Sequence, residues 1–252
     1  MNYPRIDAYS EIESVIHNFD PRAKIITFTV LIFSFAFIES LTVAMFAVLF
    51  SVSLIFISKL PIEFVYARLK YPIIFIFAIF VIMCFTVEGN IIIDSYFVSV
   101  TLEGLKIGLL IFLRATAALI IAFLMLATNR FDTVIKALYM LKLPNAVVQM
   151  IVFSYRYIFV LVDEFQNMKK SMSAKGFEIK ANRYGLSTIG NLIGMLLVKS
   201  YERGERVHKS MISKGYEGKP RMDTNYNLMF SDYVLTIFMM IFAFGVHIYP
   251  VI

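Results

Sequence analysis

A short segment that contains a lysine and a glycine occurs twice in this chain of 252 residues. Residues 171–178 are Ser-Met-Ser-Ala-Lys-Gly-Phe-Glu and residues 210–217 are Ser-Met-Ile-Ser-Lys-Gly-Tyr-Glu, with five of the eight positions identical. A lysine in the last turn of a helix is favoured by the helix dipole, and a following glycine can end the helix in the left-handed conformation. This role explains the Lys-Gly step but not the recurring Ser, Met, aromatic residue and Glu. The repeat predicts a surface presented twice, where each helix end offers a cation and a neighbouring hydrophobic side chain to a complementary groove.

No pattern for catalysis accompanies the repeat. The Gly-Lys step at 218–219 is followed by Pro220, and it lacks the earlier glycine of a phosphate-binding loop, so backbone amides cannot wrap ATP there. The three histidines are far apart in the sequence, which argues against a shared metal site: His17, His208 and His247. We expect no catalytic residue, no metal site and no bound cofactor on this chain, and a protein that is not an enzyme.

The composition is typical of an integral membrane protein. Hydrophobic residues make up 59% of the chain and aromatic residues 15%. Five apolar runs could form helices that cross a bilayer: 25–38, 41–58, 71–87, 104–128 and 233–249. The first run is shorter than the roughly 20 residues that a spanning helix needs, whereas the fourth is ample. The sequence predicts an all-α integral membrane protein with about five transmembrane helices.

The net charge of +6 is concentrated in one block. Residues 128–228 hold sixteen of the 24 Lys and Arg residues but only eight of the 18 acids. The connection 59–70, predicted as a short amphipathic segment, has three cations, whereas 88–103 has acids and no Lys or Arg. Lys and Arg concentrate in cytoplasmic connections. We therefore expect a multi-pass protein of the plasma membrane with its N-terminus and both basic segments in the cytoplasm.

This topology divides the chain into four parts: a cytoplasmic segment 1–24, transmembrane helices 1–4 in 25–128, a cytoplasmic helical domain 129–228 and a final transmembrane helix in 229–252. A count of six or seven spans stays open, because 147–162 and 186–198 are also apolar. Arg156 lies in the middle of the first of these stretches, and acids follow it. This pattern favours a long amphipathic helix that rests on other protein or on the membrane surface.

Helix signals within the basic domain place the repeats. Asp132 can cap a short helix that ends before Pro144. Asn145 can cap the next helix, which is predicted to end at the first repeat with Gly176 in the left-handed conformation. Another helix is predicted to end at the second repeat, with Gly215 in the same role. Both copies are therefore expected at helix C-termini in the cytoplasmic domain.

Two further features could carry function. Arg114 lies near the middle of the fourth apolar run, where a charge is costly and is usually paired or faces a protein interface. We favour a role in anchoring helices over contact with a transported species, because no second intramembrane charge accompanies it. The segment Asp-Pro-Arg-Ala-Lys at 20–24 is typical of a helix start with proline in the first turn.

Taken together, these motifs resemble the T component, the transmembrane coupling subunit, of energy-coupling factor (ECF) transporters. The resemblance covers nearly the whole chain, and any one of its motifs alone would be weak. Its motifs are an N-terminal Asp-Pro-Arg-x-Lys, a Leu-x-x-Pro hinge, a Tyr-Arg-Tyr with a following acidic pair, and two Ala-Arg-Gly signatures. In this chain they correspond to Asp20, Pro21, Arg22 and Lys24, to Pro144, to Arg156 and Glu164, and to Ala174-Lys175-Gly176 and Ser213-Lys214-Gly215.

The resemblance implies a membrane scaffold without catalytic activity. Its two signatures would dock in grooves of two ABC-type ATPase subunits, which would bind ATP and Mg²⁺. The scaffold would also hold a membrane S component that binds the substrate, with a small accessory membrane subunit as a further candidate, and no nucleic acid. The implied structural and coupling residues are Asp20, Pro21, Arg22, Lys24, Arg114, Pro144, Arg156 and Glu164.

The cobalt-type, CbiQ-like branch is the most similar in pattern. It shares the Ile-Asp-Ala-Tyr at 6–9 and the stretch Ser-Tyr-Glu-Arg-Gly-Glu-Arg-Val at 200–207. Cobalt or nickel uptake is the favoured transport function, and vitamin transport is the alternative. Rivals of another class are an intramembrane enzyme that uses Arg114 on a lipid and a self-sufficient channel or carrier. Both are disfavoured because Arg114 has no intramembrane acid beside it in the sequence.

One departure concerns the signature itself. Its arginine is replaced by lysine in both copies, Lys175 and Lys214. Lysine keeps the charge but lacks the planar fork that binds a carboxylate through two hydrogen bonds. Because both copies differ in the same way, we expect a matched change in a partner that is used twice.

Overall fold

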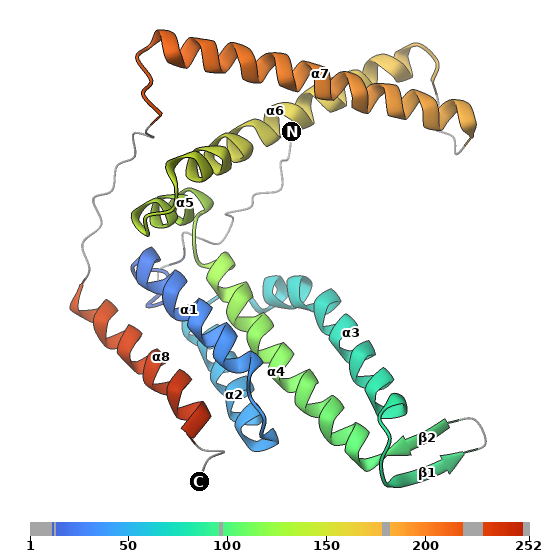
Figure 1. Ribbon diagram of the computed structural model, residues 1–252, viewed down its shortest axis with the longest axis vertical. Helices are drawn as coiled ribbons and strands as arrows, with labels where there is room; N and C mark the ends of the chain where they lie inside the picture. The colour runs from blue at the N-terminus through green and yellow to red at the C-terminus, as the bar shows by residue number, and fades with distance from the viewer. Residues whose placement is uncertain (1–11, 13, 96–97, 178–181, 219–228, 249–252) are drawn as a thin grey trace. The chain divides into compact units, whose positions relative to one another are not determined.

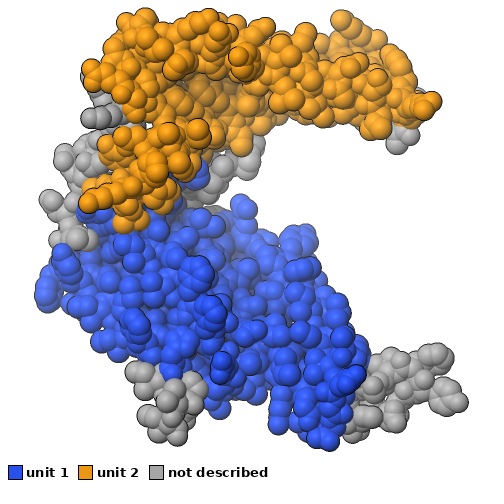
Figure 2. All heavy atoms as spheres, in the orientation of Figure 1, with its two compact units in different colours: residues 1–137, 224–252 blue, residues 138–223 orange. Residues whose placement is uncertain are grey.

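The computed structural model describes residues 12, 14–95, 98–177, 182–218 and 229–248. The chain forms two compact units, shown in different colours in Figure 2. The first consists of residues 1–137 and 224–252, and the second of residues 138–223. Each unit is described by itself.

The first unit is a helical bundle with one short hairpin (Figure 1). Its helices are α1 (Pro21–Ala36), α2 (Leu41–Ser58), α3 (Ile62–Thr86), α4 (Leu102–Ala127) and α8 (Phe230–Ile248). Between α3 and α4 the antiparallel strands β1 (Ile91–Ser95) and β2 (Val98–Thr101) form a two-stranded sheet. The predicted all-helical membrane fold is confirmed, and the hairpin is an addition that the sequence pattern did not reveal.

Helix α4 is the centre of this bundle, because α1, α2 and α3 all pack against it, while α8 packs against α1. The core is built from large apolar side chains of α1 and α4, among them Phe28, Leu31, Phe35, Ile121 and Leu124, all fully buried. Two glycines let α3 approach α4 closely. A Cβ on Gly104 would lie 2.9 Å from the carbonyl oxygen of Met83, and one on Gly108 would lie 3.0 Å from the Phe80 ring.

Helix α3 corrects one prediction. Residues 59–70 were expected to form a separate amphipathic segment before a span at 71–87. Instead a single helix runs from Ile62 to Thr86, with Pro72 inside it. Proline lacks an N–H and usually weakens a helix interior, so the sequence signal favoured a break at this point.

Five helices are long and apolar enough to cross a membrane: α2, α3, α4, α6 (Asn145–Ala174) and α8. The number agrees with the predicted count, but the membership differs in one helix. Helix α1, predicted as the first span, has only 16 residues, whereas α6 qualifies by length and composition.

The second unit contains α6 and α7 (Arg183–Ser213), two long helices that cross each other (Figure 1). The short helix α5 (Phe131–Met140) lies in the chain before them. Among the described residues, α6 buries only Val148, and α7 buries only Gly185 and Leu192. The two helices therefore present most of their side chains on the surface of their unit.

Candidate functional site: two equivalent helix ends

The two repeated segments end their helices with the same backbone conformation. In α6, Lys175 is the C-cap and Gly176 has a φ of 79°. In α7, Lys214 is the C-cap and Gly215 has a φ of 78°. Glycine tolerates this left-handed conformation because it has no Cβ. Both predicted helix ends are confirmed.

The hydrogen bonds at the two ends are also the same. The N–H of Phe177 donates to the carbonyl of Met172 over 3.1 Å, and the N–H of Tyr216 donates to the carbonyl of Met211 over 3.0 Å. In each copy the glycine N–H donates to the carbonyl three residues earlier, at 3.0 and 2.9 Å. This pattern is the Schellman motif, in which the aromatic and methionine positions commonly make a hydrophobic contact. Helix termination therefore explains the recurring Met and aromatic residue, which the sequence analysis had assigned to a partner surface.

The two lysines stabilise the helix ends, and their charges are also available to a partner. Lys175 and Lys214 are exposed, as are Ala174 and Ser213 before them. Within the described part of the chain, neither lysine side chain has an ion pair or a hydrogen bond. Figure 1 shows the two helix ends at opposite ends of the second unit. Two equal, unpaired cations held at a fixed separation can bind two carboxylate-bearing surfaces at once.

The segment 20–24 forms a helix start in the first unit, as predicted. The Asp20 carboxylate accepts a hydrogen bond from the backbone N–H of Arg22 over 2.9 Å, which caps α1, and Pro21 occupies the first turn. The Arg22 guanidinium donates to both carboxylate oxygens, at 3.2 and 3.1 Å. Burial raises the pKa of Asp20, but the hydrogen bonds and charge of Arg22 outweigh it and hold that pKa below its ordinary value. The carboxylate is therefore ionised where α1 begins.

Lys24 links α1 to the end of α4. Its side chain is completely buried, and Nζ donates to Oδ1 of Asn129 over 2.8 Å. The carbonyl oxygen and hydroxyl of Thr128 lie 3.4 Å away as weaker acceptors. A buried amino group needs such acceptors because an unpaired polar group is costly to bury. The motif lysine thus acts as a clamp between two helices.

Asp20 also links α1 to α8. Its backbone N–H donates to Oδ1 of Asp232 over 3.3 Å, and the other Asp232 oxygen accepts from the N–H of Met229 over 2.9 Å. An acid in this position of the first turn stabilises a helix N-terminus. The sequence analysis missed Thr128, Asn129 and Asp232. The signal available for Asp232 was an acid in the first turn of an apolar helix, but no local signal joined it to a residue more than 200 positions earlier.

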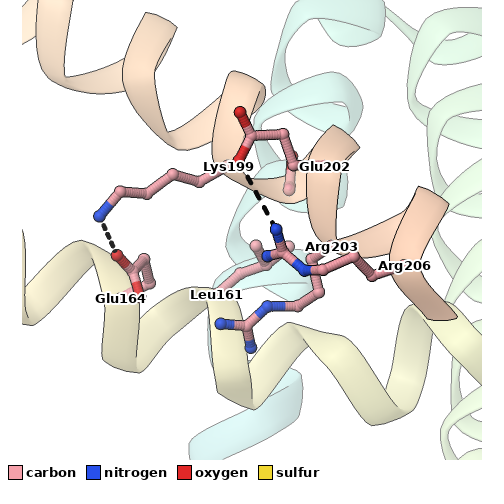
Figure 3. A pocket seen from close by; sticks show the side chains of 7 residues that line it. Leu161, Glu164, Lys199, Glu202, Arg203 and Arg206 are labelled. Carbon is pink, nitrogen blue, oxygen red and sulfur yellow. Dashed lines mark hydrogen bonds and ion pairs between the residues drawn. The ribbon is translucent and has the colours of Figure 1, made fainter.

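Pro144 and Glu164 have structural roles in the second unit. Pro144 occupies the N-cap position of α6, so the prediction that Asn145 caps this helix is wrong: Asn145 is its first helical residue. The carboxylate of Glu164 accepts from Nζ of Lys199 over 2.5 Å, which ties α6 to α7 (Figure 3). Arg156 is exposed on α6 and has no ion pair within the described residues.

Arg114 does not join either cluster. It lies in the middle of α4 and is half-buried in the first unit. Its side chain has no ion pair or hydrogen bond among the residues whose structure is described. Arg114 therefore has no polar partner on another helix in the described part of the unit. Its role in anchoring helices stays a prediction.

The chain was compared with known proteins. A family model described as "CbiQ: Cobalt transport protein" matches residues 12–226. The chain belongs to the CbiQ family. The energy-coupling factor transporter transmembrane protein EcfT of Bacillus subtilis is 30% identical over 229 residues, which is 84% of each chain. The protein of the same name from Ruminiclostridium cellulolyticum is 28% identical over 86% of each chain. An uncharacterized protein of Methanocaldococcus jannaschii is 27% identical over 93% of this chain and 82% of its own length.

These relatives and the five apolar helices make the chain a multi-pass membrane protein and a T component of an ECF transporter. The family identified from the sequence motifs is thereby confirmed. The match begins at residue 12, so it includes segment 20–24 and both helix ends.

Proposed function

We propose that this CbiQ-family chain transmits an ATP-driven conformational change from two ATPase subunits to a membrane component that binds the substrate. In this proposal ATP and Mg²⁺ are bound by the ATPases, and the chain itself carries no catalytic residue. In this proposal α1 crosses the membrane together with α2, α3 and α4, and α6 does not. Four crossings leave the N-terminus and the second unit both in the cytoplasm, where the excess of Lys and Arg favours them.

The observation that supports the proposal best is the equivalence of the two helix ends. Lys175 and Lys214 have the same C-cap position, the same glycine after them and the same exposure. One kind of acidic groove, present on each of two ATPase subunits, could therefore receive both ends. Lysine presents a single ammonium instead of a two-pronged guanidinium, so the groove needs only a point negative charge.

The test is a charge reversal at both ends. In the full chain, co-expressed with its cognate ATPase subunits, Lys175→Glu together with Lys214→Glu should abolish copurification of the ATPases. The matched control is Lys170→Glu with Lys209→Glu, because each of these exposed lysines stands five residues before a docking lysine. Membrane insertion should be unchanged in both double variants. Retention of the ATPases in near-wild-type amount by the first variant would refute docking through these ends.

We further propose Co²⁺, with Ni²⁺ as a close alternative, as the transported substrate. The printed description of the matching family supports cobalt, and so do segments 6–9 and 200–207, of which the first lies outside the described residues. A vitamin is the alternative. Uptake of radiolabelled Co²⁺ by cells that depend on the intact complex should be lost when this chain is deleted. If Co²⁺ uptake persists while uptake of a vitamin is lost, the cargo assignment is wrong.

A further inference from the structure

A groove with four cations lies beside the second of the two equivalent helix ends, the end of α7. It has a volume of about 530 Å³ and is formed by α6 and α7. Its lining cations are Arg156, Arg203, Arg206 and Lys214, and no carboxylate lines it. Ser210 and Tyr157 add hydroxyl groups that could donate further hydrogen bonds.

The acids near this groove are either paired with another cation or too far from the groove to neutralise its charge. Glu164 is paired with Lys199 at 2.5 Å. Glu202 lies 3.8 Å from Arg206, a long contact between two exposed side chains, and such pairs contribute little. Figure 3 draws both pairs as dashed lines and shows Arg203 without a partner among the residues drawn. Arg203 also acts on Glu164, whose pKa is lowered chiefly by Lys199 and further by Arg203. Arg156, Arg203 and Lys214 have no ion pair within the described residues, so four cations and one shared carboxylate leave the groove with an excess of positive charge.

Among the described residues, the other helix end has a less charged cavity. The cavity beside Lys175 has a volume of about 420 Å³, and Lys175 is the one cation among its lining residues. Lys169, Lys170 and Arg183 are exposed in nearby parts of the chain, but they do not line this cavity. The two ends are therefore equal in backbone geometry, and they differ in the number of described cations that line the cavity beside each.

Two exposed apolar residues of α6 lie on the side of that helix opposite Arg156. Val147 and Phe165, both exposed, are each nine residues from Arg156. Nine residues are two and a half helical turns, so Arg156 lies opposite both. A membrane or an apolar partner that covers the Val147 side would leave the Arg156 side open to a polar, acidic partner.

We propose that this groove binds carboxylates of the ATPase subunit that docks on the α7 end, so that the two ATPases are held unequally. This inference rests on the proposed docking function and adds residues to one of its two contacts. Arginine suits the role because its planar guanidinium can donate two parallel hydrogen bonds to one carboxylate. The groove is continuous with Lys214, so one acidic surface could engage both.

The experiment isolates the α7 end in the full chain. Lys175→Glu removes the α6 contact, and Arg156→Gln with Arg203→Gln is then added to this background. The matched control in the same background is Lys170→Gln with Arg183→Gln, which removes one exposed cation from each helix outside the groove. The affinity for the purified ATPase subunit is measured at several concentrations of NaCl.

The groove variant should bind the ATPase at least about tenfold more weakly than the control, with a flatter dependence on salt, because fewer charges attract the partner. The conservative variant Arg156→Lys with Arg203→Lys keeps the charge and should lose less affinity. Equal affinity and equal salt dependence of the groove and control variants would overturn the inference. A stronger release of the ATPase by inorganic phosphate than by chloride at equal ionic strength would also overturn it, because the groove would then be a phosphate site.

Two outcomes separate this inference from the docking proposal. If Lys175→Glu with Lys214→Glu leaves ATPase binding intact, the docking proposal fails and the inference fails with it. If that double reversal abolishes binding while the groove variant matches its control, docking stands and only the unequal contact is refuted. Thermal unfolding of each variant confirms that a loss of binding is not a loss of fold.

Discussion

The two units of this chain use similar amino acids in opposite ways. The first unit buries large apolar side chains against α4, and it also buries Lys24, whose side chain has a partner within the unit in Asn129. The second unit buries few side chains of α6 and α7 and leaves apolar residues such as Met150 and Tyr201 exposed. Exposed apolar surface of this extent is typical of interaction sites. The first unit also exposes large apolar side chains, such as Phe46 and Phe244. The units differ because the first has a buried core, whereas α6 and α7 bury almost nothing among the described residues.

The largest difference between the units is expected when a large apolar side chain is truncated in each. Phe28→Ala should destabilise the first unit by about 3–5 kcal/mol, because Phe28 is fully buried and its removal leaves a cavity. The Tm of the detergent-solubilised chain should fall by on the order of 10 °C. Ile158→Ala on α6 is the counterpart, because Ile158 is 50% exposed, and it should change stability by about 0.5 kcal/mol or less. Equal effects of the two variants would show that the second unit is packed as tightly as the first.

A smaller difference is expected for one polar contact in each unit. Asn129→Ala removes the principal acceptor of the buried Lys24 amino group and should cost about 1.5–3 kcal/mol. Lys199→Met removes the pair with Glu164, whose side chains are 45% and 26% exposed, and should cost about 0.2–1 kcal/mol. Thermal unfolding of both variants beside the wild type measures the difference. A larger loss from Lys199→Met would contradict the assignment of the buried clamp to the first unit.

The smallest effect concerns Asp20 and depends on pH. The folded state lowers the pKa of Asp20, so its stabilisation is present above the pKa of the unfolded chain, about 3.9, and is lost as the pH falls through the folded value. Asp20→Asn keeps a capping side chain but removes the charge that faces Arg22 and the helix N-terminus, so it should cost about 0.3–1 kcal/mol at neutral pH. This cost should shrink as the pH falls below about 4. Tm profiles of wild type and variant that stay parallel into acid would show that the Asp20 charge does not contribute.

Local signals in the sequence predicted much of the fold. Apolar runs predicted α2, α4 and α8. The Lys-Gly steps predicted where α6 and α7 end, because the end of a helix depends on residues within one turn. The break expected before Tyr71 was wrong, because packing can hold a helix through a proline that local propensity disfavours. The hairpin at Ile91–Ser95 and Val98–Thr101 lay in a short connection without a strong turn signal.

The sequence by itself determined the membrane class, the family motifs and the two equivalent helix ends, since each of these depends on composition or on neighbours along the chain. Only the tertiary structure decided which distant residues meet. Lys24 reaches Asn129 across 105 positions, and Asp20 reaches Asp232 across 212. It also brought Arg156 of α6 to the same groove as Arg203 of α7, beside the end of α7. Such contacts depend on how helices cross, and no local pattern of residues encodes a crossing.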